Sequence, residues 1–488
     1  MSGTARHDPE AYKNPGFWCK TTFIQLGYGI WVNLSAMGIG LAFGFPAVMV
    51  PQLFRPDSDI HPSLIEESWI ASVLSLSAPF GCLISGLLSD RFGRSKLLFL
   101  SEGPMSVGWL YTGFAKTPVD IVIGRLITGI GCGMAMSCPR IYLTEMSLPN
   151  MRAVTGAFPT LGVSCGITIE AGLGAYFHWT ILCYIGGIFS IILLLTNYFL
   201  PESPYYTLLK DSEENARKTL MKFRSKKHDI DSEMADMLRF KRSHKLYKLS
   251  LLEMMKSVVK PYAYRPFFMV LGYFALTQFS GIYVVVMWAV VMLQQSKSTV
   301  EANFGNVLLG VTRVVAGVVV AVILFKAKRR PMALISAAGE GIVCISIGLY
   351  IHWSPGPTLF PQLCYMSYIV LATIGYGTLP FMLMGEAYPL QIRGMLVGVS
   401  LSVFNLFMFF TNFIFVYETK YLGFANTMIM FGIVSLVSFV ILYIFLLETK
   451  ELTLVQIEEY FRQEHPVLPF RMKPEMLVGT TGKEAETK

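Results

Sequence analysis

The chain has 488 residues and a formal net charge of +8, and 53% of its residues are hydrophobic whereas only 15% are charged. Soluble domains carry about 25% charged residues, so this composition excludes a soluble protein of that length. Many apolar residues lie in runs long enough to cross about 30 Å of hydrocarbon. The composition and the mean hydropathy of +0.52 therefore predict an all-α polytopic membrane protein.

Twelve apolar stretches follow one another along the chain, and each is long enough to form a membrane-spanning helix. A polar leader precedes the first stretch, and no cleavage site of small residues follows it. We therefore interpret this stretch as a span and not as a signal peptide. The expected spans are 25–46, 67–89, 97–115, 119–144, 154–177, 179–200, 267–294, 303–325, 332–353, 362–385, 395–418 and 424–447.

A long polar loop separates the sixth span from the seventh and holds 15 of the 40 Lys and Arg residues. Basic loops stay on the cytoplasmic side, so this loop and both termini should be cytoplasmic, and the net charge indicates topology and not a nucleic-acid partner. A 3.6-residue pattern within the loop predicts short amphipathic helices around 212–223 and 231–240. The expected organisation is a tail (1–24), a six-helix bundle (25–200), a helical linker (201–266), a second six-helix bundle (267–447) and a tail (448–488).

The turn after the second span reads GLLSDRFGRSK and occupies 86–96. Gly93 permits a tight turn because glycine has no Cβ. Asp90, Arg91 and Arg94 are then placed to form a charged latch at the cytoplasmic rim. The combination of these spacings is rare in a surface loop.

A glutamate stands seven residues before an arginine at the same point of each half of the chain. The first pair is Glu145 and Arg152 in TEMSLPNMR, and the second is Glu386 and Arg393 in GEAYPLQIR. Each pair lies between two apolar runs. Topology signals or snorkelling side chains are the alternative explanation of charges at span ends.

These motifs, together with the stretches GRLITGIGCGM, PES, QFSG, GYGTLPF and ETKELTL, resemble the sugar porter family of the major facilitator superfamily, and in particular insect facilitated trehalose and glucose transporters. The resemblance covers about residues 25–460. It implies two six-helix bundles related by an axis along the membrane normal, with solute binding near the midplane and alternating access. It also implies cytoplasmic salt bridges that hold the outward-open state, in which Arg94 joins Glu145 and Arg329 joins Glu386.

The same resemblance implies a set of substrate contacts in the middle of the membrane. In family members that carry hexoses, amide and acid side chains bind the sugar hydroxyls, and several of these side chains are replaced here. Each solute hydroxyl left without a hydrogen-bond partner weakens binding by about 1–3 kcal/mol. A larger, more apolar or partly anionic solute therefore stays an alternative to an ordinary hexose. The implied positions are Thr160, Thr277, Gln278, Tyr283, Arg313, Thr373, Phe381 and Asn412.

Several ionisable residues fall inside the expected spans, and such residues are functional candidates by default. We single out Arg140, Glu170, Arg313 and Glu340, with internal pairing or snorkelling as the alternative. The part of the first span where proton-coupled relatives carry an aspartate, 40–48, contains no acid. We expect facilitated diffusion unless Glu340 or Glu170 supplies a proton.

The prediction is thus a plasma-membrane transporter of sugars or sugar-like solutes of the hexose or trehalose class. Alternatives are a carrier of a non-sugar, possibly anionic, solute and a transporter-like sensor with little transport. The chain has no P-loop, metal-spaced cluster or nucleophile elbow, so we expect no enzyme activity and no cofactor. The expected partners are the solute and the lipid bilayer, without nucleic acid or an obligate protein partner.

Overall fold

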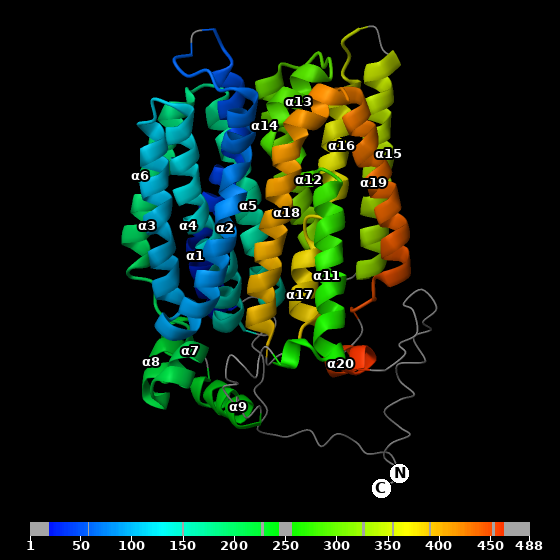
Figure 1. Ribbon diagram of the computed structural model, residues 1–488. Helices are drawn as coiled ribbons and strands as arrows, with labels where there is room; N and C mark the ends of the chain where they lie inside the picture. The colour runs from blue at the N-terminus through cyan, green and yellow to red at the C-terminus, as the bar shows by residue number, and fades with distance from the viewer. Residues whose placement is uncertain are drawn as a thin grey trace.

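The computed structural model describes residues 19–56, 58–148, 151–225, 229–243, 256–324, 327–353, 356–389, 392–450 and 454–462. Within these ranges the regular elements are helices, apart from a single β-bridge between Ser298 and Thr358. The long helices run roughly parallel to one axis in two groups that stand side by side (Figure 1). We refer to these groups as the N-terminal half and the C-terminal half.

The N-terminal half contains six long helices, coloured blue to green-cyan in Figure 1. Five of them contain an internal proline, at which the local hydrogen-bond ladder is interrupted. The bounds agree with the six expected spans to within a few residues, although α1 is longer at both ends. The helices are α1 (Lys20–Leu53), α2 (Leu64–Phe92), α3 (Arg94–Gly113), α4 (Pro118–Met146), α5 (Arg152–Gly174) and α6 (Trp179–Asn197).

The C-terminal half corresponds to the other six expected spans, two of which are broken into shorter helices. Its helices lie at the right of Figure 1 and are coloured from green to orange. They are α11 (Pro261–Phe279), α12 (Ile282–Met287), α13 (Ala289–Gln295), α14 (Ala302–Ile323), α15 (Arg329–Trp353), α16 (Phe360–Ile374), α17 (Leu379–Ala387), α18 (Arg393–Tyr421) and α19 (Phe424–Phe445).

The breaks in the seventh and tenth spans were not expected from the sequence. In the seventh span, Gly281 adopts φ +88° between α11 and α12, and a Cβ at this position would lie 2.8 Å from the ring of Phe431. Only glycine adopts this backbone conformation without strain, and only glycine leaves room for the ring this close to the backbone. In the tenth span, α16 ends at Ile374 and α17 begins at Leu379, where Pro380 fits the first turn of a helix.

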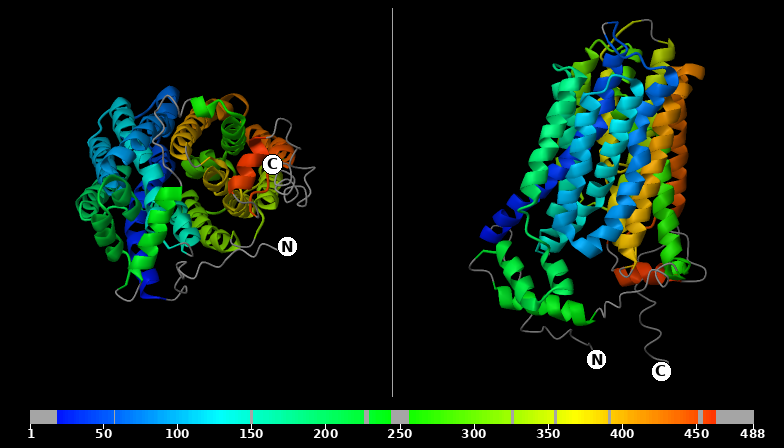
Figure 2. Two further views of the ribbon diagram at one scale, coloured as in Figure 1. Left: turned by 90° about the horizontal axis from the view of Figure 1, so that it is seen from below. Right: turned by 60° about the vertical axis from the view of Figure 1, so that its left-hand side comes forward.

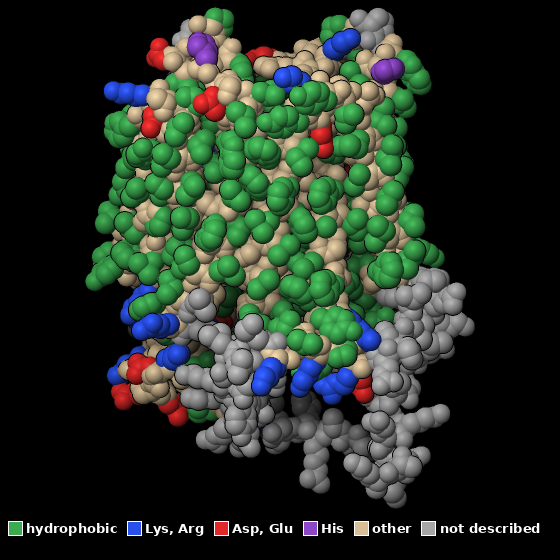
Figure 3. Space-filling view, viewed as in Figure 1, with side chains coloured by type: hydrophobic (Ala, Val, Ile, Leu, Met, Phe, Trp, Pro, Cys, Tyr) green, Lys and Arg blue, Asp and Glu red, His purple; other side chains and the backbone are tan. Residues whose placement is uncertain are grey.

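The surface of the long helices is suited to a bilayer. Hydrophobic side chains cover the middle of the face in Figure 3, while Lys and Arg gather toward its lower end. Nine helical segments of the described residues are long and apolar enough to span a membrane, the tenth expected span counting as one from α16 to α17. The remaining three of the twelve expected spans are α3, α5 and the seventh span. The seventh span is divided into α11, α12 and α13, and α3 and α5 are less apolar than the other spans.

Two pairs of helices make the most extensive contacts between the halves. Helix α2 packs along α18, and α5 packs along α14. Glycines permit the approach of α14, because a Cβ on Gly310 would lie 2.9 Å from the Cα of Thr168. These pairs join the second span to the eleventh and the fifth to the eighth, so the two halves use equivalent helices.

Shorter helices gather at one end of the bundle, which we call the linker end. Helices α7 (Pro204–Lys210), α8 (Glu213–Lys222) and α9 (Ile230–Ser243) lie below the N-terminal half, and α20 (Leu454–Arg462) lies below the C-terminal half (Figures 1 and 2). The predicted amphipathic helices of the loop are therefore confirmed. Arg224 attaches them to the bundle, because it pairs with Glu233 at 2.5 Å and donates to the carbonyl of Met146 at 2.9 Å.

Candidate functional site

A cavity lies between the two halves, at the level where α12 begins and α16 gives way to α17. Twelve of its lining residues come from α1, α4 and α5, and eight come from the C-terminal half. The part of the cavity that the centres of water molecules can reach has a volume of about 70 Å³, which leaves room for several water molecules. Because both halves contribute to its wall, any relative movement of the halves changes the cavity.

The wall of the cavity is apolar except for two cationic groups and a few hydroxyls. Ser164, Thr373 and Thr378 each donate to a carbonyl of the backbone nearby, at 3.0, 2.7 and 2.9 Å. A hydroxyl that donates in this way still has a free acceptor lone pair. The polar lining is Thr160, Ser164, Tyr283, Arg313, Thr373, Thr378 and Arg140.

The two cationic groups belong to opposite halves. Arg140 on α4 lies with its guanidinium carbon 4.8 Å from the ring centre of Phe381 on α17, a cation–π contact across the interface. Arg313 belongs to α14, and the Tyr283 hydroxyl is an electrostatic neighbour of both arginines. Within the described part of the chain neither arginine has a carboxylate at ion-pair distance.

Five of the eight expected substrate positions line this cavity, and three do not. Thr160, Tyr283, Arg313, Thr373 and Phe381 are in its wall. The remaining positions are buried away from it. Thr277 donates to the carbonyl of Phe274, Asn412 donates to that of Met408, and the amide atoms of Gln278 have no hydrogen-bond partner among the described residues.

Three cavity residues were not among the expected substrate contacts. Arg140 was noticed only as an intramembrane charge, and Ser164 and Thr378 were not noticed. Ser164 stands four residues after Thr160, so its position on the same helix face is a signal that the sequence does contain. Thr378 lies in the break between α16 and α17, for which the hydrophobic pattern gives no signal.

The two acids singled out from the sequence, Glu170 and Glu340, are not among the residues that line the cavity. Glu340 is buried and accepts a hydrogen bond from Ser336 at 2.9 Å. Glu170 is buried near Arg125, whose guanidinium lies over the ring of Phe45. Their positions favour internal polar packing over direct contact with a solute.

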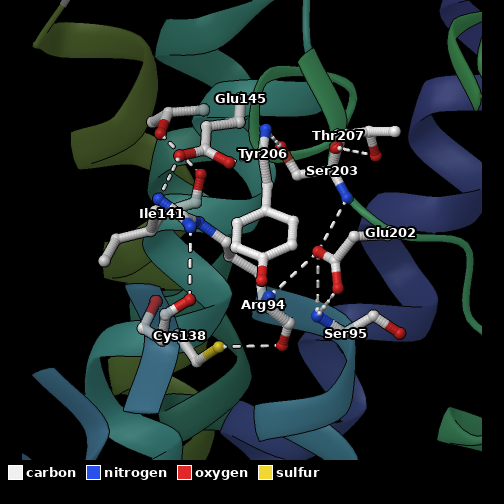
Figure 4. A network of polar contacts seen from close by, with 11 residues as sticks. Arg94, Ser95, Cys138, Ile141, Glu145, Glu202, Ser203, Tyr206 and Thr207 are labelled. Carbon is white, nitrogen blue, oxygen red and sulfur yellow. Dashed lines mark hydrogen bonds and ion pairs between the residues drawn. The ribbon is translucent and has the colours of Figure 1, made fainter. Parts of the chain in front are cut away.

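At the linker end of the N-terminal half, polar contacts join α2, α3, α4 and α7 (Figure 4). Arg94 pairs with Glu145 at 3.1 Å, and Ser203 donates to the same carboxylate. Glu202 accepts from the backbone N–H groups of Arg94 and Ser95 at 2.9 and 3.3 Å. We call this group the N-terminal clamp.

The C-terminal half repeats this arrangement. Arg329 pairs with Glu386 at 3.3 Å, and Thr449 donates to the same carboxylate at 2.5 Å. Glu448 accepts from the backbone N–H groups of Arg329 and Arg330 at 2.9 and 3.0 Å. We call this group the C-terminal clamp, in which Glu448 and Thr449 correspond to Glu202 and Ser203.

The expected pairings of Arg94 with Glu145 and of Arg329 with Glu386 are thus present. The side chain of Arg393 instead donates to the carbonyl of Tyr388 at 3.0 and 3.2 Å, and that of Arg91 lies beside the ring of Phe92. The side chains of Asp90 and Arg152 lie outside the described residues. The roles of Glu202 and Glu448 were missed, although both follow the last span of their half.

A family model described as "Sugar (and other) transporter" matches residues 39–461, which is most of the chain. The chain belongs to the sugar transporter family. Among curated members, the facilitated trehalose transporter Tret1 of Apis mellifera ligustica is 27% identical over 451 residues, covering 90% of this chain and 88% of that protein. The Tret1-2 homolog of Drosophila sechellia is 26% identical, with 91% and 92% covered.

Solved structures show the fold of this sugar transporter family member. The inward open xylose transporter XylE from E. coli has a TM-score of 0.73 at 18% identity, covering 89% of this chain and 99% of that one. The human organic anion transporter MFSD10 has a TM-score of 0.57 at 16% identity, with 86% and 99% covered. The protein therefore has the major facilitator fold, with twelve membrane helices in two six-helix bundles.

Proposed function

We propose that the chain transports a sugar or sugar-like solute, of the hexose or trehalose class, across a membrane by alternating access. The observation that carries this proposal is the cavity between two equivalent helix bundles in a member of the sugar transporter family. Binding at such an interface allows the two halves to rock around the solute. Facilitated trehalose transporters among the curated relatives support this solute class.

In this proposal the moving units are the bundles 25–200 and 267–447, joined by the linker 201–266. The linker end faces the cytoplasm, and both termini lie on that side of the plasma membrane. The basic residues of the linker support this orientation, because Lys and Arg are retained on the cytoplasmic side. In this proposal the two clamps hold the cytoplasmic ends of each bundle together in the outward-open state and open when the inner side opens.

Facilitated diffusion is the proposed mode of transport. No acidic residue is among the described residues that line the cavity, so none of these residues offers a carboxylate that can exchange a proton with the solute pathway. The part of α1 beside the cavity, 40–48, also contains no acid. A carrier with this lining equilibrates its solute down the gradient.

Counterflow in proteoliposomes tests the proposal. Purified protein is reconstituted into vesicles preloaded with unlabelled sugar, and uptake of labelled glucose or trehalose is measured without any pH gradient. We expect saturable uptake that exceeds uptake by protein-free vesicles. The proposal is wrong if correctly inserted protein supports no counterflow of any hexose, disaccharide or sugar derivative.

A further inference from the structure

The two cavity arginines differ from the arginines of the two clamps and of the linker attachment. Arg94, Arg224 and Arg329 each have a carboxylate partner, at 3.1, 2.5 and 3.3 Å. Arg140 and Arg313 have none among the described residues, although they lie in an apolar cavity within membrane-spanning helices. A cation kept in such a place without a counter-charge is costly, and such residues mark solute or ion pathways.

The aromatic ring beside Arg140 offsets only part of this cost. The contact with Phe381 covers one face of the guanidinium and supplies no hydrogen-bond acceptor. Among the described residues, the hydroxyl groups of Tyr283 and Tyr368 act electrostatically on Arg313. Two guanidinium groups, each with five N–H donors, thus line a cavity in whose wall no carboxylate is found among the described residues.

The hydroxyls of the cavity complement these donors. Ser164, Thr373 and Thr378 already donate to backbone carbonyls, so they present acceptors to a solute. A hydroxylated solute can donate to these oxygens. A carboxylate on the same solute can accept from the guanidinium groups, for which it has matching planar geometry.

We infer that the solute is an acidic sugar, in which a carboxylate binds between Arg140 and Arg313 while the hydroxyls donate to Ser164, Thr373 and Thr378. This inference rests on the proposed function and specifies its substrate class. It explains why one cation comes from each half. The anion draws both halves together around it, so binding and closure of the cavity are coupled.

Binding to the purified full-length protein tests the inference apart from transport. The ligands are D-glucuronate, its uncharged methyl ester and D-glucose, which share most hydroxyls and differ in charge. We expect glucuronate to raise the melting temperature at concentrations at least tenfold lower than the ester or glucose. Equal effects of the acid and the ester would overturn the inference.

Substitutions at the cavity supply the second part of the test. Arg313→Gln and Arg140→Gln should each weaken glucuronate binding at least tenfold while the weak response to glucose is retained. Arg217→Gln, at an exposed arginine of α8, is the control and should bind glucuronate as the unaltered protein does. Should a glutamine variant not fold, Arg313→Lys, which keeps the charge and loses the planar fork, should still weaken binding.

Counterflow separates this inference from the proposed function. Uptake of labelled glucuronate that exceeds glucose uptake supports both. Uptake of neutral sugars with no preference for the acid overturns the inference and leaves sugar transport intact. Arginine-dependent glucuronate binding without any counterflow supports the site and contradicts transport. Absence of both binding and counterflow overturns both.

Discussion

The two glutamates that the sequence places at equivalent points each hold an arginine of their own half. Glu145 binds Arg94, and Glu386 binds Arg329, with side-chain exposures between 9% and 24%. A pair in this range is shielded from water only in part, so its attraction is screened less than that of a surface pair while its desolvation cost is lower than that of a fully buried one. Each carboxylate also accepts from a hydroxyl of the segment that follows the last span of its half.

Glu386→Gln removes the charge that compensates Arg329 and weakens the contact with Thr449. We expect a destabilisation of the C-terminal clamp by about 1–3 kcal/mol and a changed balance between the two access states. A single cysteine introduced at Gly385, beside the clamp, reports this balance through its rate of alkylation. Expression at the membrane should be retained.

The matched control is Glu214→Gln, since Glu214 pairs with Lys218 on the exposed surface of α8. In the Glu214→Gln variant, the cysteine introduced at Gly385 should be alkylated at the same rate as in the protein without this substitution. If Glu386→Gln also leaves the rate unchanged, the clamp does not contribute to the access equilibrium. Combining Glu386→Gln with Arg329→Gln should restore part of the lost stability, because the unpaired cation is then removed.

At the scale of single elements, helix contacts between the halves depend on residues without side chains. Gly310 on α14 faces Thr168 on α5, and Gly317 on the same helix faces Leu161. A Cβ at either position would lie 2.9 Å from the opposite helix. Close packing at these glycines allows one half to slide and rotate against the other, while at the other helix pair Ser402 on α18 donates to the carbonyl of Pro79 on α2 at 3.3 Å.

Gly310→Ala should therefore lower the stability of the protein by about 1–3 kcal/mol through overpacking. The measurement is the melting temperature of the purified protein. Gly103→Ala on α3 is the control, because a Cβ there meets nothing within 4 Å and alanine favours helix more than glycine does. An equal melting temperature for both variants would show that the α5–α14 contact adapts without cost.

The helices were largely predictable because long apolar runs have few alternatives in a bilayer. The breaks at Gly281 and between α16 and α17 were not, because they depend on contacts with residues distant in sequence, such as Phe431. These breaks also affect the site. Thr373 and Tyr283 beside them line the cavity, whereas Thr277 and Gln278, just before the first break, are turned into the protein.

At the scale of the whole molecule, the distribution of charge and helices gives a defined orientation. The linker helices and most of the basic residues visible in Figure 3 lie toward one end, and the short loop between α1 and α2 lies at the other (Figures 1 and 3). Positive charge at one end resists translocation. The sequence alone predicts this orientation, because it depends on composition and not on side-chain packing.

Cysteine labelling in intact cells checks the orientation. On a background in which the reactive native cysteines are replaced, His61→Cys should react with an impermeant maleimide added outside. Lys218→Cys in α8 should react only after the membrane is permeabilised, and both positions are exposed in the structure. The reverse pattern would place the linker end outside the cell and contradict the proposed orientation.

The cavity arginines have an electrical consequence. When the cavity exchanges access between the two sides of the membrane, two elementary charges change their position within the transmembrane field. Each charge that crosses the whole field is worth about 2.3 kcal/mol per 100 mV. If the solute is the monoanion inferred above, the empty carrier reorients with the two positive charges of Arg140 and Arg313 and the loaded carrier with a net charge of one there, so the membrane potential acts more strongly on the return step than on the loaded step.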